Sequence, residues 1–143
     1  MRREIEVKMV VQAPKKAIGL QLPINLGKQG YFATNTTTIS QISTNINNLL
    51  LTKPGERRFN NQFGSSLYNL LFDNINFEVT KEILVDTVQR DLDKFINGIT
   101  VTNVSLKTEE SLGKDKNTIF ISVTFTYNNT VATTTINLSN TTL

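Results

Sequence analysis

Apolar and polar residues alternate most regularly near the C-terminal end of the chain, and this pattern predicts β-structure. Every second residue of one run is apolar, at Ile119, Ile121, Val123, Phe125 and Tyr127. A period of two is typical of a strand that buries one face. The pair Asn128-Asn129 then predicts a tight turn into a further strand over residues 130–138.

Another strand is predicted over residues 99–108, ahead of that hairpin. Its apolar residues change parity between Val101 and Val104, which a β-bulge near Thr102-Asn103 would explain. Residues 109–117 are charged and predict a loop. The three strands together predict an antiparallel meander.

A longer period replaces this alternation in the middle of the chain and predicts helices. Three threonines offer N-cap hydroxyls before an apolar stripe at Ile39, Ile42, Ile46, Leu49 and Leu50. Gly64-Ser65 opens a short helix, and Asn76 is the predicted cap of a long helix that ends near Ile96. The expected fold class is α+β: two longer helices and one short helix form a small layer on an antiparallel meander of three to four strands. The long helix is expected to pack on that meander.

The N-terminal part of the chain is less regular. Residues 4–11 alternate in polarity, which is typical of a strand or of an arm that becomes a strand on a partner. Ala13-Pro14 ends this run, and apolar residues alternate again over 18–22 to predict a second short strand. We therefore expect an arm over residues 1–16 and one domain over 17–143, a size that suits one modest core.

Composition narrows the chemistry chiefly by exclusion. The 143 residues include no Cys, no His and no Trp. Disulfides, thiolate or imidazole metal sites and His- or Cys-dependent catalysis are therefore excluded. Only 19% of the residues are charged, and the abundant Asn and Thr leave much hydrogen-bonding surface free for neighbours. A biased genome is an equal explanation for the same composition.

The charge pattern argues against nucleic acid and membranes as partners. The net charge is +3, and the basic excess lies before residue 30 without interleaved aromatic residues or a recognisable nucleic-acid-binding motif. A solvated arm, or one that contacts acidic protein surface, fits this pattern better. No apolar run approaches the roughly 20 residues of a membrane span, and the N-terminus has no signal-peptide core.

Candidate catalytic residues are sparse. A glycosidase needs two carboxylates in different environments, and Glu56 is the single acid beside a distinctive backbone. The segment 27–30 contains two glycines but lacks phosphate-loop spacing, and no EF-hand spacing is present. We expect no catalytic residue, cofactor, metal or small-molecule substrate.

The most distinctive residues follow the first predicted helix. They are Pro54, Gly55, Glu56, Arg57, Arg58 and Phe59, then Phe63 and Gly64, and finally Leu70, Leu71 and Phe72. In the structural interpretation, Glu56 or Arg57 holds the loop by bonding backbone groups, while Phe59 and Phe63 plug the core beneath it. In the functional interpretation, the charged residues contact a neighbouring subunit. We favour the first interpretation, with Arg58 as a plain surface residue.

These motifs resemble the baseplate wedge family of contractile phage tails, often called gene-25-like, which includes a baseplate subunit of type VI secretion systems. The resemblance runs from about Ala17 to the last strand. It rests on the segments 18–24, 31–34, 49–52, 54–57, 63–67 and 70–73. Two departures stand out. Residues 95–99 read Phe-Ile-Asn-Gly-Ile where relatives commonly have Trp-Glu-Pro-Arg-Ile, and residues 60–62 lack a proline that relatives often carry.

The resemblance implies a non-enzymatic part of the inner baseplate wedge, made in the host cytoplasm and located in the virion. It also implies hetero-oligomeric assembly around the tail tube, with other wedge proteins and the tail sheath as partners. Relatives present a β-element from which the sheath begins to polymerise. Residues 130–138 lack the charges and proline that normally protect an edge strand, so Thr133 and Thr135 are candidates for strand addition. An ordinary terminal strand is an equal reading of that segment.

Two other functions stay open at this point. The same fold in a type VI secretion system or another contractile injection machine is the nearer alternative. A peptidoglycan hydrolase is the more distant one, because some families of phage tail proteins carry a lysozyme label.

Overall fold

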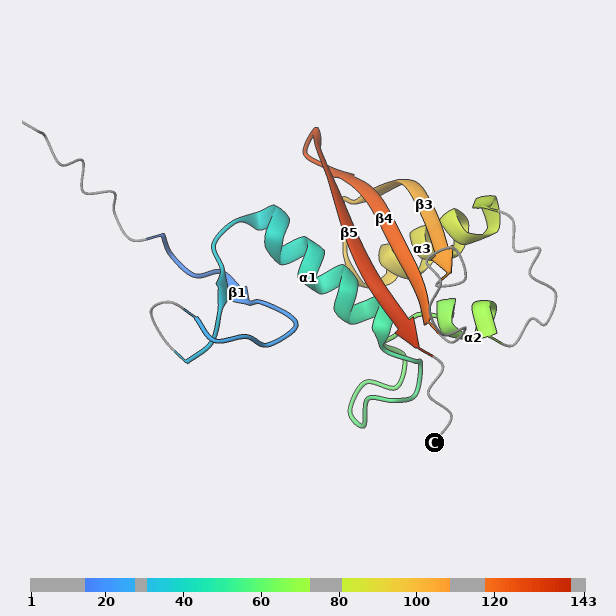
Figure 1. Ribbon diagram of the computed structural model, residues 1–143, viewed down its shortest axis with the longest axis horizontal. Helices are drawn as coiled ribbons and strands as arrows, with labels where there is room; N and C mark the ends of the chain where they lie inside the picture. The colour runs from blue at the N-terminus through green and yellow to red at the C-terminus, as the bar shows by residue number, and fades with distance from the viewer. Residues whose placement is uncertain (1–14, 28–30, 73–80, 109–117, 140–143) are drawn as a thin grey trace, which may run out of the picture.

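The computed structural model describes residues 15–27, 31–72, 81–108 and 118–139 (Figure 1). Its elements in chain order are β1 (Gly19–Leu20), β2 (Thr34–Asn35), α1 (Thr38–Leu51), α2 (Leu67–Phe72), α3 (Lys81–Phe95), β3 (Thr100–Thr108), β4 (Thr118–Tyr127) and β5 (Thr130–Ser139). This arrangement confirms the predicted α+β class. Residues 1–14 of the predicted N-terminal arm, the cap at Asn76 and the loop 109–117 lie outside the described residues.

The meander is the three-stranded antiparallel sheet β3-β4-β5. The register between β3 and β4 shifts between Val101 and Asn103, which confirms the predicted bulge. Asn128 and Asn129 have φ angles of 45° and 61°. Positive φ at both central residues is the signature of a type I′ turn, whose twist matches that of the strands it joins.

Two helices cover the buried face of this sheet, which confirms the predicted helical layer on the meander. The helix α3 packs against β3, and α1 packs against β5 at the opposite edge. A side-chain hydrogen bond of 2.7 Å from Thr134 Oγ1 to Asn47 Oδ1 ties β5 to α1. The core lies between these layers, with fully buried side chains that include Phe125, Ile46, Leu49, Leu92 and Val88.

The helix α1 begins as its sequence predicts. Thr37 is its N-cap and has an extended backbone, and its hydroxyl accepts a 3.3 Å hydrogen bond from the Ser40 amide. Such a bond satisfies one of the amides that a helix leaves free at its start. The polar face of α1 carries no charge, so its stability comes from the apolar stripe that it buries.

A second, two-stranded sheet lies at the N-terminal end of α1 (Figure 1). The strand β1 falls within the segment predicted to be a strand, but no strand was predicted at its partner β2. The Ile18 amide donates to the Asn35 carbonyl at 2.8 Å. Local propensity gives little sign of a two-residue strand, because its pairing depends on a partner strand that is distant in the sequence.

Candidate functional site

The turn after α1 is held by its own backbone and by one carboxylate. Gly55 has a φ of 89°, a conformation that favours glycine. The Lys53 amide donates to Glu56 Oε2 at 3.0 Å, while the Glu56 amide donates to the Lys53 carbonyl at 3.1 Å. Glu56 therefore has the local role that the structural interpretation assigned to Glu56 or Arg57.

Gly64 marks a close crossing of two chain segments. Its φ is 138°, and a Cβ at this position would lie 2.7 Å from backbone atoms of Thr52, Lys53 and Pro54. The neighbouring Ser65 amide donates to the Thr52 carbonyl at 2.9 Å. Only glycine allows the returning loop to lie this close to the end of α1.

Aromatic side chains fasten the loop to the core. The Arg57 guanidinium lies 3.7 Å from the ring centroid of Phe63, whose ring is 5.1 Å from that of Phe95. Phe63 thus contacts both a cation and a second aromatic ring, and it is partly buried against the core as predicted. Phe72 is also half-buried and lies 4.6 Å from the Tyr68 ring.

Phe59 contradicts the prediction that it plugs the core. Its side chain is 100% exposed. Phe63 packs against the core, while Phe59 lies four residues earlier, within the exposed residues 53–62 of the loop. The aromatic residue type indicates burial on average, but it does not tell which of two nearby aromatic residues reaches the core.

Asp91 is the residue that the sequence reasoning missed. Only 3% of it is exposed, and its Oδ2 accepts bonds from Ser65 Oγ at 2.7 Å, from the Ser66 amide at 3.0 Å and from Ser66 Oγ at 3.3 Å. Asp91 belongs to α3, and these bonds hold the residues at the start of α2 in place. The signal lay in the apolar stripe of α3, because Asp91 falls on the same helical face as Val88 and Leu84.

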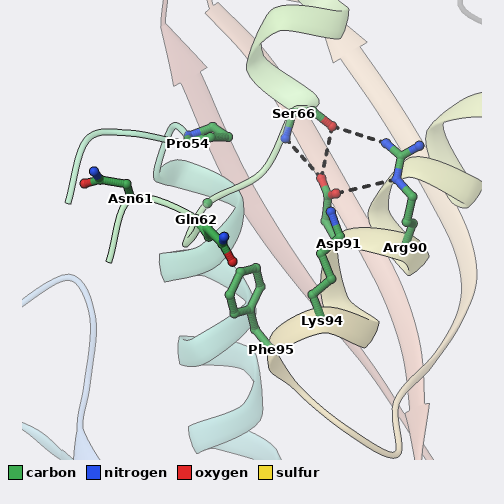
Figure 2. Close-up of a pocket in the computed structure, with 9 residues that line it drawn as sticks. Pro54, Asn61, Gln62, Ser66, Arg90, Asp91, Lys94 and Phe95 are labelled. Carbon is green, nitrogen blue, oxygen red and sulfur yellow. Dashed lines mark hydrogen bonds and ion pairs between the residues drawn. The ribbon is translucent and has the colours of Figure 1, made fainter. Parts of the chain in front are cut away.

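A cleft of about 740 Å³ lies between α3 and the loop that follows α1 (Figure 2). Arg90, Asp91, Lys94 and Phe95 line one side from α3, and Pro54, Asn61, Gln62, Gly64 and Ser66 line the other. Arg90 is the exposed partner of the single ion pair among the described residues, with its Nε 3.8 Å from Asp91 Oδ1. Its NH2 group also donates to Ser66 Oγ at 3.4 Å.

The cleft presents cations and hydrogen-bond donors rather than a pair of catalytic acids. Asp91 is the one carboxylate that lines the cleft. Its Oδ2 already accepts three hydrogen bonds from Ser65 and Ser66. Arg90 and Lys94 line the cleft and are exposed, so an anionic group could reach them. The described residues contain no cluster of three acids that could hold a metal ion.

The free edge of β5 is the second candidate site. Tyr127 and Thr130 close a two-residue turn, and a pair in that position exchanges both ladder hydrogen bonds. Because the pattern alternates along an antiparallel strand, the backbone groups of Thr133 and Thr135 point away from β4. No described strand pairs with them on that side.

The hydroxyls of these two threonines are already engaged on the outer face of the sheet. Thr135 Oγ1 lies 3.0 Å from Ser122 Oγ, and Thr133 Oγ1 lies 3.1 Å from Thr124 Oγ1. The structure therefore separates the predicted site residues. Pro54 and Gly64 line the cleft, whereas Thr133 and Thr135 lie on the edge strand. Phe59 belongs to neither site.

An open, uncharged strand edge combined with a cationic cleft is typical of a domain that binds other proteins. Comparison with known families narrows this class. The sequence matches the family described as "Baseplate wedge protein gp25" over residues 36–132, and the chain belongs to that family. This membership supports a role as a component of the baseplate of a phage tail or a related contractile injection machine, assembled with other baseplate proteins.

The fold is similar to that of a solved structure. The crystal structure of a protein from Geobacter sulfurreducens, described as a candidate tail lysozyme, has a TM-score of 0.59 and 19% sequence identity. The similarity covers 74% of this chain and 94% of that one. A search of curated proteins found no match. Among the described residues, no helix is long and apolar enough to cross a membrane.

Proposed function

We propose that this chain is a non-catalytic part of the inner baseplate wedge of a contractile tail, and that the tail sheath begins to polymerise on its β5 edge. Membership of the baseplate wedge family carries the first part of the proposal. The outward backbone groups of Thr133 and Thr135 support the second part. A sheath subunit would add one strand to β5 and extend the sheet.

Three features make β5 suitable for strand addition. Its ten residues include no charged side chain and no proline, the usual means by which an edge is protected. The hydroxyls of Thr133 and Thr135 are hydrogen-bonded to β4, so they do not compete for the backbone groups of a strand that joins the edge. Its other face is fixed to α1 through Asn47, which keeps the edge rigid before the partner arrives.

A proline at Thr135 tests the edge directly. This change removes an amide that points outward, so the β4–β5 ladder keeps its hydrogen bonds and the domain stays folded. We expect T135P baseplates to assemble without sheath, as seen by electron microscopy. Thr135→Val keeps the amide and should allow sheath growth. Normal sheaths on T135P baseplates would refute strand addition at this edge while leaving the baseplate role intact.

The machine that contains this baseplate is a phage tail in our proposal, with a type VI secretion system or another contractile injection machine as the alternative. The genes beside this one distinguish these machines. Cross-linking mass spectrometry on purified particles, using Lys15, Lys53 and Lys94, then identifies neighbouring baseplate proteins. Absence of the chain from such particles would contradict the baseplate role itself.

Peptidoglycan hydrolysis is the competing activity, and the geometry of the cleft does not favour it. A glycosidase places two carboxylates on either side of the scissile bond, whereas Asp91 alone lines this cleft. We expect purified protein to leave peptidoglycan suspensions turbid. Clearing that is lost in both Glu56→Gln and Asp91→Asn variants would instead support a hydrolase.

A further inference from the structure

The small sheet at the start of α1 exposes an unusual number of large apolar side chains. We call residues 15–27 and 31–35 the N-terminal lobe. Six of the ten exposed large hydrophobic residues in the described chain belong to it: Ile18, Leu20, Ile24, Leu26, Tyr31 and Phe32. Leu26 and Tyr31 are each 88% exposed. Scattered exposed apolar residues are ordinary, but a concentration of this kind marks a surface that binds something.

The lobe is nevertheless fixed in place by a buried polar residue. Asn35 is 3% exposed, and its Nδ2 donates to the Leu20 carbonyl at 3.2 Å and to Thr44 Oγ1 at 2.9 Å. Its Oδ1 accepts from Ser40 Oγ at 2.6 Å. These bonds join β1, β2 and α1 through one side chain. A two-stranded sheet is marginal by itself, so this network is what holds its shape.

Close backbone packing reinforces this attachment. A Cβ at Gly19 would overlap the Gln41 side-chain amide, which also accepts a 3.0 Å bond from Asn35. A Cβ at Gly27 would overlap the Phe32 carbonyl. The lobe is therefore built with close-fitting contacts between backbone and polar groups, while its large apolar side chains face outward. This combination preorganises those side chains for a partner.

Charge indicates what kind of partner fits. The sequence contains no Asp or Glu between residues 15 and 55, while Lys15 and Lys16 belong to the lobe. The exposed face of α1 beside it is also uncharged. A partner surface with carboxylates around an apolar centre complements this arrangement. A second copy does not, because it would bring the same lysines together without any acid between them.

We propose that the N-terminal lobe is an anchor that docks into an apolar groove, bordered by carboxylates, on a different protein of the same assembly. The proposal rests on the proposed function only in locating that protein within the baseplate. The anchor is separate from the cleft, because the lobe and the cleft loop lie at opposite ends of α1 (Figure 1). The lobe residues also precede the matched family region at 36–132. Tyr31 and Phe32 are the expected centre of the contact, since aromatic residues dominate the energetics of such interfaces.

The test compares aromatic-to-serine changes in two exposed regions, the lobe and the loop after α1. Particles are assembled with the Tyr31→Ser/Phe32→Ser double variant or with the Phe59→Ser control. We expect the lobe variant to fold normally, with a melting temperature within about 3 °C of the parent chain because surface changes cost little. Its amount per particle, measured by quantitative mass spectrometry, should fall at least tenfold. The control should incorporate like the parent chain, and equal incorporation of all three proteins would overturn the proposal.

Photo-cross-linking identifies the occupant. A Leu26→p-benzoylphenylalanine chain in assembled particles should cross-link to a different baseplate protein, at a peptide with apolar residues and nearby Asp or Glu. Cross-links to a second copy, to residues 1–14 of the same chain, or to nucleic acid would each overturn the proposal. If the chain is present in particles but gives no cross-link from Leu26, the anchor is wrong and the baseplate role stands. If the chain is absent from particles, the baseplate role fails as well.

Discussion

The regions at the two ends of α1 are each held by a buried polar side chain of their own. They differ in whether their apolar side chains are exposed or packed against the core. At the N-terminal end, neutral Asn35 holds a lobe whose apolar residues are exposed. At the C-terminal end, charged Asp91 holds a loop whose Phe63 packs against the core. A buried carboxylate needs several donors to offset its lost hydration, and here Ser65 and Ser66 supply them. The Asp91 end is therefore part of the folding core, whereas the Asn35 end is an attachment added to it.

Removing the carboxylate at the C-terminal end should have the largest effect. Asp91→Ala leaves the Ser65 hydroxyl and the Ser66 amide without their acceptor and removes the ion-pair partner of Arg90. We expect a loss of about 2–4 kcal/mol in the free energy of unfolding. Urea denaturation followed by circular dichroism measures it. Arg90→Ala, at an exposed partner, should cost under about 1 kcal/mol, and similar losses in the two variants would contradict this account.

Close backbone packing at the same end gives the next largest effect. Gly64→Ala introduces a Cβ 2.7 Å from three backbone atoms at a φ of 138°. We expect a loss of about 2–3 kcal/mol. Gly55 is the matched control, because its φ is 89° but a Cβ there meets nothing within 4 Å. Gly55→Ala should therefore cost only about 1 kcal/mol, from backbone conformation alone.

The Asn35 end should respond locally rather than globally. Asn35→Ala removes the side chain that joins the lobe to α1, but it leaves the main core untouched. We expect the global stability to fall by about 1 kcal/mol, while the Ile18 and Gln21 amides exchange much faster. Hydrogen exchange measured by mass spectrometry separates these two outcomes. Equal acceleration throughout β4 and β5 would show that the lobe folds as part of the core.

The smallest effect is expected at the loop tip. Phe59→Ser changes a fully exposed side chain, so the free energy of unfolding should stay within about 0.5 kcal/mol of the parent value. Phe63→Ser, four residues away, removes a ring that contacts Arg57 and Phe95 and should cost about 2–3 kcal/mol. Thermal unfolding of the two variants would show whether burial, rather than residue type, decides how much stability each change costs.

Residue patterns indicated much of the sheet because its signals are local. Alternating apolar residues predicted β4, the Asn128-Asn129 turn predicted the strand that follows it, and a parity change predicted the bulge in β3. The candidate site was harder to predict. The loop motif drew attention to Pro54, Glu56 and Gly64, but the cleft is completed by Arg90 and Lys94, which looked like ordinary surface charge on a helix.

The sequence by itself therefore determined which segments become the three helices and the strands of the meander, because periodicity reports which face of an element avoids water. It also determined the absence of Cys and His chemistry. Only the tertiary structure decided that Asp91 is buried against Ser65 and Ser66, that Phe59 is exposed while Phe63 packs, and that β2 pairs with β1. These outcomes depend on contacts between residues far apart in the chain, and one-dimensional periodicity does not specify which distant residue will be the partner.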